Sequence, residues 1–198
     1  MKKLQSTLPN MVIVLTVTTM IAGFLLGYVY ERTADARDKS ANEKLIGAIN
    51  NVVSGFDNDP VAEREEVNVG TQSVTVYPAT KGGKLIGCAV ESSSENGFSG
   101  VIKIVTGFDR QGNILGYAVT SHSETPGLGA KMGEWFSGDG KRTVIGRNPS
   151  VKALKVSKDG GDVDGITAAT ITSRAFLEAV NLAAQGAMEY YQTNDKMK

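Results

Sequence analysis

The feature that most constrains this chain is an uncharged run, MVIVLTVTTMIAGFLLGYVY, which fills residues 11–30. As a helix, 20 residues are long enough to cross the hydrocarbon core of a bilayer. Tyr28 and Tyr30 stand where interfacial aromatic residues gather. A cleaved signal peptide would have a shorter apolar core and a small-residue cleavage site, for which Ala34 and Ala36 are poor candidates. We therefore expect an uncleaved single-pass transmembrane helix behind a short tail at residues 1–10.

The direction of this helix is not decided by charge, because basic residues flank it on both sides. The short tail is purely basic, with Lys2 and Lys3, which is typical of an anchor that leaves the large domain translocated. Gly23 and Gly27 form a small-xxx-small pattern that lets a neighbouring helix approach closely. The same pattern also arises from the ordinary glycine content of membrane helices.

Composition excludes several classes of function. Lys+Arg and Asp+Glu are both 21, so a formal net charge of zero argues against a nucleic-acid partner. The single cysteine, Cys88, cannot form an internal disulfide, an iron–sulfur site or a structural zinc site by itself. With His122 as the only histidine, we expect no metal site. The chain also contains no P-loop and no G-x-G-x-x-G motif after a strand, so hydrolase and nucleotide-binding functions are disfavoured.

A juxtamembrane helix is predicted over residues 31–55. The apolar positions Leu45, Ile46, Ile49, Val52 and Val53 fall on one helical face, which we expect to dock on the soluble domain. Gly55 and the FDNDP segment end this helix. The remaining residues, 56–198, form the soluble domain.

Alternating apolar residues predict strands in the first half of that domain, at 73–80, 84–90, 101–108 and 113–121. The last two are expected to form a hairpin across Asp109–Gly112. A short helix near 131–136, a strand at 151–156 (VKALKV) and a final helix at 173–192 follow. One face of that helix carries Phe176, Val180, Ala183, Ala187 and Tyr191. The predicted fold class is α+β: one N-terminal transmembrane helix, then a mixed α/β domain.

Two stretches carry residues suited to chemistry. HSETPGLGAK, residues 122–131, puts Glu124, Thr125 and Lys131 around a sharply turned backbone whose amides are free to face a ligand. DGITAATITS, residues 164–173, crowds hydroxyls before the last helix. Thr170, Thr172 or Ser173 could cap that helix. Its free amides could equally bind an anion. On their own, the two stretches are also compatible with a surface turn and a helix cap.

Taken together, these stretches match a known family. Asp-Gly-x-Thr-Ala-Ala-Thr-x-Thr, residues 164–172, resembles the flavinylation signature of the FMN-binding domain family. His-x-Glu-Thr-Pro-Gly-Leu-Gly, residues 122–129, resembles the family's hallmark loop, and so does Gly97–Gly100 before VIKIVTGFD. The motifs occur in the family's order behind a membrane anchor. Within the family, the chain resembles the RnfG subunits of Rnf ion-translocating electron transport complexes. The NqrC-type subunit of sodium-translocating NADH:quinone reductases is the alternative.

The resemblance implies a covalently bound FMN, held as a phosphoester to Thr172 and transferred from FAD by a separate flavin transferase that releases AMP. The chain departs from the family at Ala168, where Gly is usual, and this costs little unless the position needs a positive φ. The phosphate would lie near Thr167 and Thr170, and Lys131 would tune the ring. The full set of residues expected to bind the cofactor is Glu124, Thr125, Gly127, Leu128, Gly129, Lys131, Asp164, Gly165, Thr167, Ala168, Ala169 and Thr170.

The resemblance further implies an electron-transfer subunit of a ferredoxin:NAD oxidoreductase complex and not a stand-alone enzyme. The expected location is the bacterial inner membrane, with the soluble domain on the periplasmic side. The expected partners are the other Rnf subunits, the flavin transferase and the lipid bilayer. Two other interpretations stay open: an extracytoplasmic module that binds flavin non-covalently, and a scaffold protein whose threonine-rich stretch is only a helix cap.

Overall fold

A computed structural model describes residues 7–196, which fall into two compact units divided between Glu43 and Lys44. The first unit contains α1 (Leu8–Arg32) and the beginning of α2 (Ala34–Val52). α1 has 25 residues and a mean hydropathy of 2.2, and none of its residues is buried. The hydroxyl groups of Thr18 and Thr19 donate to the carbonyls of Val14 and Leu15, one turn earlier. An apolar environment would therefore not leave these two hydroxyls unsatisfied.

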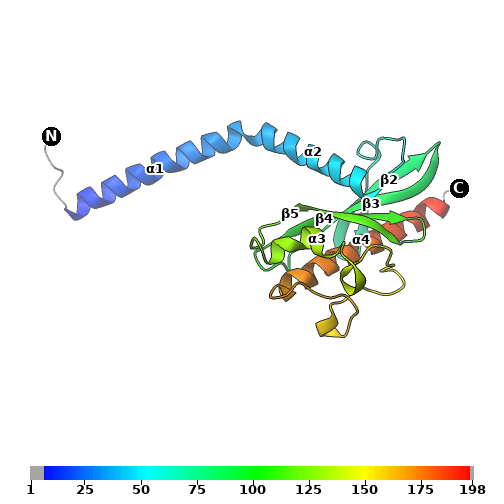
Figure 1. Ribbon diagram of the computed structural model, residues 1–198. Coiled ribbons are helices and arrows are strands. Elements are labelled where there is room, and N and C mark those ends of the chain that lie inside the picture. Colours follow the sequence, from blue (N-terminus) through cyan, green and yellow to red (C-terminus); the bar gives the residue numbers. More distant parts are fainter. Residues whose placement is uncertain (1–6, 197–198) are drawn as a thin grey trace. The chain divides into compact units, whose positions relative to one another are not determined.

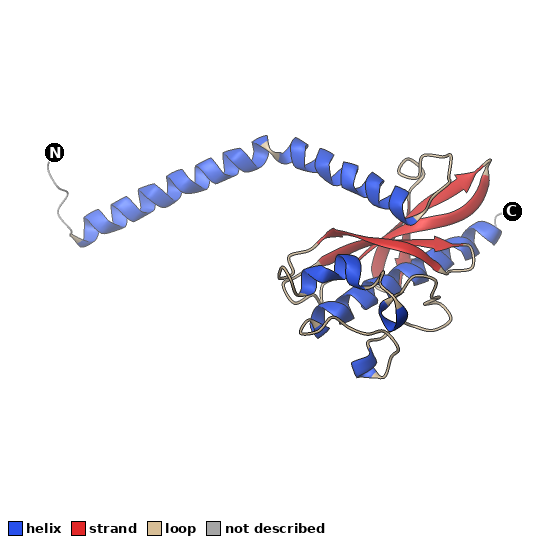
Figure 2. Cartoon of the chain, viewed as in Figure 1, coloured by secondary structure: helices blue, strands red, loops and turns tan. Residues whose placement is uncertain are grey.

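The second unit is built on an antiparallel sheet of five strands in sequence order (Figure 2). The strands are β1 (Glu65–Val69), β2 (Gln72–Lys81), β3 (Lys84–Ser94), β4 (Ile102–Asp109) and β5 (Ile114–Ser121). The predicted hairpin between β4 and β5 is confirmed. Asp109 Oδ1 accepts hydrogen bonds from the amides of Gln111 and Asn113, and Gly112 has a φ of 84°. The mixed helix-and-sheet architecture confirms the expected fold class.

The C-terminal helix α4 (Thr170–Lys196) runs along one face of the sheet (Figure 1). The five residues predicted to share its inner face are all buried in the main core, which confirms that prediction. The sheet residues alternate as a strand requires. In β3, Cys88 and Val90 belong to the core under α4, whereas Ala89 belongs to a second core on the opposite face.

The end of α2 covers that opposite face. Ala48, Ile49, Val52 and Val53 pack there on the strand residues Tyr77, Ala79, Ala89 and Val105. A Cβ atom at Gly107 would collide with the Val52 carbonyl oxygen, so only glycine allows this close approach. The helix is shorter than the predicted 31–55. Ile46 was expected on the docking face but is 47% exposed, whereas the buried residues of this helix are Ala48, Ile49 and Val52.

Two predictions of strands need correction. VKALKV, residues 151–156, is not a strand and contributes only an isolated bridge between Val156 and Val163. The backbone of Leu154 is instead satisfied by Asn181 of α4, whose side chain accepts from the Leu154 amide at 2.8 Å and donates to its carbonyl at 2.9 Å. β1 was not predicted at all, because this edge strand begins with two exposed glutamates and pairs only with β2.

Candidate functional site

The two stretches singled out in the sequence form the walls of one cavity. The loop after β5 leads into a short helical turn at Gly129–Lys131 and then α3 (Met132–Trp135). This loop and the start of α4 enclose a cavity of about 320 Å³. Its lining residues are Phe98, Glu124, Thr125, Leu128, Gly129, Ala168, Ala169, Thr170, Ile171 and Thr172. Two segments that lie far apart in the sequence therefore line the same cavity.

A buried polar pair connects the two walls. The Thr172 hydroxyl donates to Glu124 Oε2 at 2.5 Å, and both residues are almost fully buried, at 1% and 4% exposure. Glu124 Oε1 accepts a hydrogen bond from the Ser99 amide at 2.9 Å. A Cβ atom at Gly129 would lie 2.6 Å from Glu124 Oε2 and 2.7 Å from Thr172 Oγ1. The pair therefore depends on glycine at position 129.

Tyr117 of β5 holds the loop wall against the sheet. Its hydroxyl donates to the Met132 carbonyl at 2.8 Å and accepts from the Phe136 amide at 3.1 Å. Its ring packs edge-on against Phe176 of α4, with centroids 4.9 Å apart. Burial raises the pKa of Tyr117, so the hydroxyl stays protonated and keeps its donor role at neutral pH.

The other wall is the tight turn that begins α4. The helix starts at Thr170, so Thr170, Thr172 and Ser173 lie within its first turn and none of them precedes it as a cap. The Ser173 hydroxyl instead accepts from the Ile166 amide and donates to the Ala169 carbonyl, both at 2.9 Å. These bonds fold the preceding loop back onto the helix.

Ala168 adopts a left-handed backbone conformation, with a φ of 61°, and is the only non-glycine residue with positive φ in residues 7–196. Alanine was expected to cost little at this position on the condition that no positive φ was needed. The structure shows that the condition is not met. A family preference for glycine here follows from the same geometry, because a Cβ atom destabilises this region of φ/ψ space.

A second cavity, of about 700 Å³, lies on the other side of this turn. It shares Ala168 and Thr170 with the first cavity. Three of the expected cofactor residues line it without reaching the first: Asp164, Gly165 and Thr167. Cationic side chains also line it, from Lys141, Arg142 and Lys158, and Lys158 Nζ donates to Thr170 Oγ1 at 3.3 Å.

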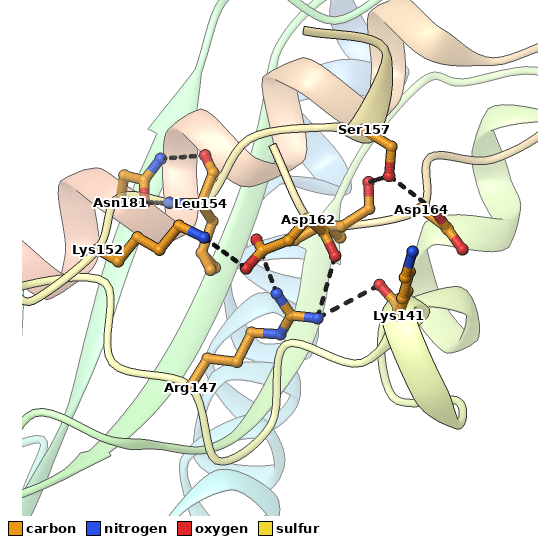
Figure 3. A network of polar contacts seen from close by, with 9 residues as sticks. Lys141, Arg147, Lys152, Leu154, Ser157, Asp162, Asp164 and Asn181 are labelled. Atoms are coloured by element: carbon orange, nitrogen blue, oxygen red, sulfur yellow. Dashed lines mark hydrogen bonds and ion pairs between the residues drawn. The ribbon is translucent and has the colours of Figure 1, made fainter. Parts of the chain in front are cut away.

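A polar network organises the loops that lead into the turn (Figure 3). Asp162 pairs with Arg147 Nη1 at 2.9 Å and with Lys152 Nζ at 2.8 Å. The hydrogen bond from Lys152, followed by the charge of Arg147, lowers the pKa of Asp162. Asp164 is engaged in the same region, where its carboxylate accepts from the Ser157 hydroxyl at 2.7 Å and its carbonyl accepts from Trp135 Nε1 at 2.8 Å.

Two expected site residues do not line either cavity. Gly127 lies at the exposed tip of the loop, with a φ of 78° that suits glycine. Lys131 is exposed at the end of the short helical turn. Two lining residues, Phe98 and Ile171, were missing from the expected set. Phe98 lies inside the Gly97–Gly100 motif, and the amide of its neighbour Ser99 donates to the buried Glu124 carboxylate. The Gly97–Gly100 motif was therefore the sequence signal that could have placed Phe98 at the cavity.

Comparison with known proteins identifies the domain. The family model for the FMN-binding domain matches residues 97–185. The G subunit of an ion-translocating oxidoreductase complex from Vibrio parahaemolyticus is 37% identical over 158 residues, covering 75% of this chain and 74% of that protein. The corresponding protein of Aliivibrio fischeri is 31% identical over 202 aligned positions, covering 96% and 93%. That of Shewanella oneidensis is 32% identical over 181, covering 86% and 85%.

The chain belongs to the RnfG family, the G subunits of ion-translocating oxidoreductase complexes. This confirms the resemblance drawn from the paired motifs. The matched FMN-binding domain extends from Gly97 to Gln185 and so contains every residue that lines the smaller cavity.

The residues present fit an FMN group. The cavity volume of about 320 Å³ lies in the range of small-molecule sites, roughly 300–1,000 Å³. The side chains of Phe98, Leu128 and Ile171 supply apolar surface at its rim and are 68%, 42% and 48% exposed. The first amides of α4 have no partner within the helix, which suits a phosphate. An apolar surface that suits a flat ring thus lies beside a helix end that suits an anion in this RnfG family member.

Proposed function

We propose that this protein is a membrane-anchored electron-transfer subunit of an Rnf-type ion-translocating complex and carries FMN in phosphoester linkage to Thr172. The observation that carries the proposal is the Thr172 hydroxyl itself. This hydroxyl lies in the motif that resembles a flavinylation signature and is buried at the smaller cavity. It is hydrogen-bonded to the carboxylate of Glu124, which belongs to the second family motif. FMN would supply the capacity to accept and release electrons, and the protein would hold it in place.

The start of α4 is suited to the proposed phosphate. Thr172 lies in the first turn, where unpaired amides and the helix dipole favour negative charge by about 0.3–1 kcal/mol. Thr170 lines the same cavity and presents a second hydroxyl. Lys158, which donates to Thr170 Oγ1, adds a positive charge on the far side of the turn. The linkage keeps the cofactor from dissociating and leaves the ring chemically unmodified.

The rim of the cavity suits a ring that exchanges electrons with neighbouring subunits. Phe98, Leu128 and Ile171 leave apolar surface exposed there. A flat ring resting on these side chains would keep one edge open to a partner. The partners in this proposal are the other subunits of the complex, since the related proteins are named as subunits of an ion-translocating oxidoreductase complex.

We place α1 in the bilayer as a single-pass anchor. It is the one described helix that is long and apolar enough to cross a membrane, and none of its residues is buried. The soluble unit would then lie on the periplasmic side of the bacterial inner membrane, as the family resemblance implies. A flavin transferase acting on that side would attach the cofactor.

The test is covalent flavin on the denatured chain. The full-length protein is coproduced with a flavin transferase and run on a denaturing gel, which is read by flavin fluorescence. We expect a fluorescent band for the wild type and for Thr172→Ser, which keeps a hydroxyl, but none for Thr172→Ala. Thr170→Ala should lose efficiency and keep label. Flavin that elutes in denaturant from the wild type would instead indicate a non-covalent module and overturn the linkage.

A further inference from the structure

We propose that Glu124 is the general base that activates the Thr172 hydroxyl for FMN attachment. The proposal rests on the proposed function, in which Thr172 is the acceptor. The one carboxylate inside the threonine motif, Asp164, accepts from the Ser157 hydroxyl and lines only the larger cavity. The amino-acid sequence alone places Glu124 only in the expected cofactor pocket. The structure brings this carboxylate, 48 positions away in sequence, to the acceptor hydroxyl.

The geometry is that of a base facing its substrate proton. Thr172 Oγ1 and Glu124 Oε2 are 2.5 Å apart, within the range for a hydroxyl donating to a carboxylate. The other oxygen of the carboxylate is also fixed, because Oε1 accepts a hydrogen bond from the Ser99 amide at 2.9 Å. The backbone is also fixed, since the Glu124 amide donates to His122 Nδ1 at 3.2 Å. Each of these contacts keeps Oε2 directed at Thr172.

The same arrangement explains how one hydroxyl is chosen among four. Ser173 is occupied, because its oxygen accepts from the Ile166 amide and donates its hydrogen to Ala169. Thr170 Oγ1 accepts from Lys158 Nζ, and a lone pair held by a cation is a poorer nucleophile. Thr167 is exposed and lines only the larger cavity. Thr172 is the hydroxyl of this stretch that a buried carboxylate orients.

The step balances without any change in oxidation state. Thr172 Oγ1 forms a bond to the flavin-side phosphorus of a flavin adenine dinucleotide, the co-reactant that the transferase supplies. The bond from that phosphorus to the bridging oxygen breaks, and AMP leaves with the electron pair. The Thr172 proton passes to Glu124 Oε2 and from there to solvent. A general base positioned beside a weak alcohol nucleophile is the usual arrangement for such activation, and a carboxylate can act as that base.

The experiment measures the initial rate of attachment in vitro as a function of pH. Purified full-length apoprotein in detergent is incubated with flavin transferase, magnesium ion and the dinucleotide, and label is read on denaturing gels. We expect Glu124→Gln to slow attachment by about 10²–10⁴-fold near neutral pH, the range for loss of a general base. The deficit should shrink as pH rises and hydroxide replaces the missing base. Glu134→Gln, an exposed glutamate of α3, is the matched control and should keep the wild-type rate.

Glu124→Asp guards against a simple loss of folding, since it keeps the carboxylate and removes one methylene. It should be slowed but retain the wild-type pH profile. Urea unfolding of each apoprotein reports folding separately from attachment. A wild-type rate in Glu124→Gln, or a deficit that is the same at every pH and is shared by Glu124→Asp, would overturn the role as base. Label that persists in Thr172→Ala would overturn the proposed attachment residue, which is a separate result.

Discussion

At the scale of single residues, two positions shape the candidate site: Ala168, which is left-handed in the turn before α4, and Glu124, which is hydrogen-bonded to Thr172. The motifs located both residues at the site. They could not reveal that position 168 needs a positive φ, since a backbone dihedral is set by the loop around it. They also could not pair Glu124 with Thr172, because that contact depends on how the loop after β5 packs against α4.

Ala168→Gly should stabilise the protein. A left-handed alanine costs about 1–2 kcal/mol. Glycine removes this strain but destabilises the folded state by about 0.4–1 kcal/mol, because it increases the conformational entropy of the unfolded chain. We therefore expect a net gain of roughly 0.5–1 kcal/mol in the free energy of unfolding. Urea denaturation of the full-length protein in detergent measures it. Ala169→Gly, at a buried position without positive φ, is the control and should destabilise. Equal losses in both variants would contradict the strain at position 168.

Gly129→Ala should break the Glu124–Thr172 pair. The new Cβ atom would lie within 2.6–2.7 Å of an oxygen atom of each residue, so the two side chains must separate. We expect flavin label on the denatured chain to fall at least about tenfold, as expected when a catalytic hydrogen bond is misplaced. Gly133→Ala in α3 is the matched control, because nothing lies within 4 Å of its Cβ position. Full labelling of Gly129→Ala would show that the pair is not needed.

At the scale of elements, the periodicity of apolar residues predicted those helices and strands that are specified by local sequence patterns. The hairpin of β4 and β5 and the buried face of α4 follow from alternation and helical spacing, and both predictions hold. VKALKV failed because an amide side chain of α4 satisfies the Leu154 backbone, and no local pattern encodes that partner. β1 was missed because an edge strand with one partner needs little apolar patterning.

The loop network around Asp162 makes stability depend on pH. Lys152 and Arg147 lower its pKa below the usual 3.8, so its contribution is fully present above that value. The contribution is lost as the pH falls through the lowered folded-state pKa. We expect Asp162→Asn to have a lower urea midpoint than the wild type at neutral pH. The gap should close as the pH drops below 3.8.

Because the Asp162 side chain is 44% exposed, we expect this gap to be small and to shrink with added salt. Urea titrations of both proteins across the acid range measure it. A gap that widens toward acid pH would contradict the sign of the effect.

At the scale of the whole molecule, the chain joins an apolar helix to a cofactor domain. If α1 spans the membrane, the protein should stay in the membrane fraction after alkaline extraction. If the soluble unit is periplasmic, protease added to intact spheroplasts should remove residues 44–198. A cytoplasmic protein of the same cells serves as the control for lysis. Protection of the soluble unit until the cells are lysed would reverse the proposed orientation.

The central claim, that FMN is attached to Thr172, is tested most directly by fragment mass spectrometry. Trypsin cuts after Lys158 and Arg174, so one peptide, residues 159–174, contains all four candidate hydroxyls. From protein coproduced with the flavin transferase, we predict that this peptide gains one FMN minus one water and that fragmentation places the gain on Thr172. The same gain on Thr167, Thr170 or Ser173, or an unmodified peptide from flavin-containing protein, would contradict the claim.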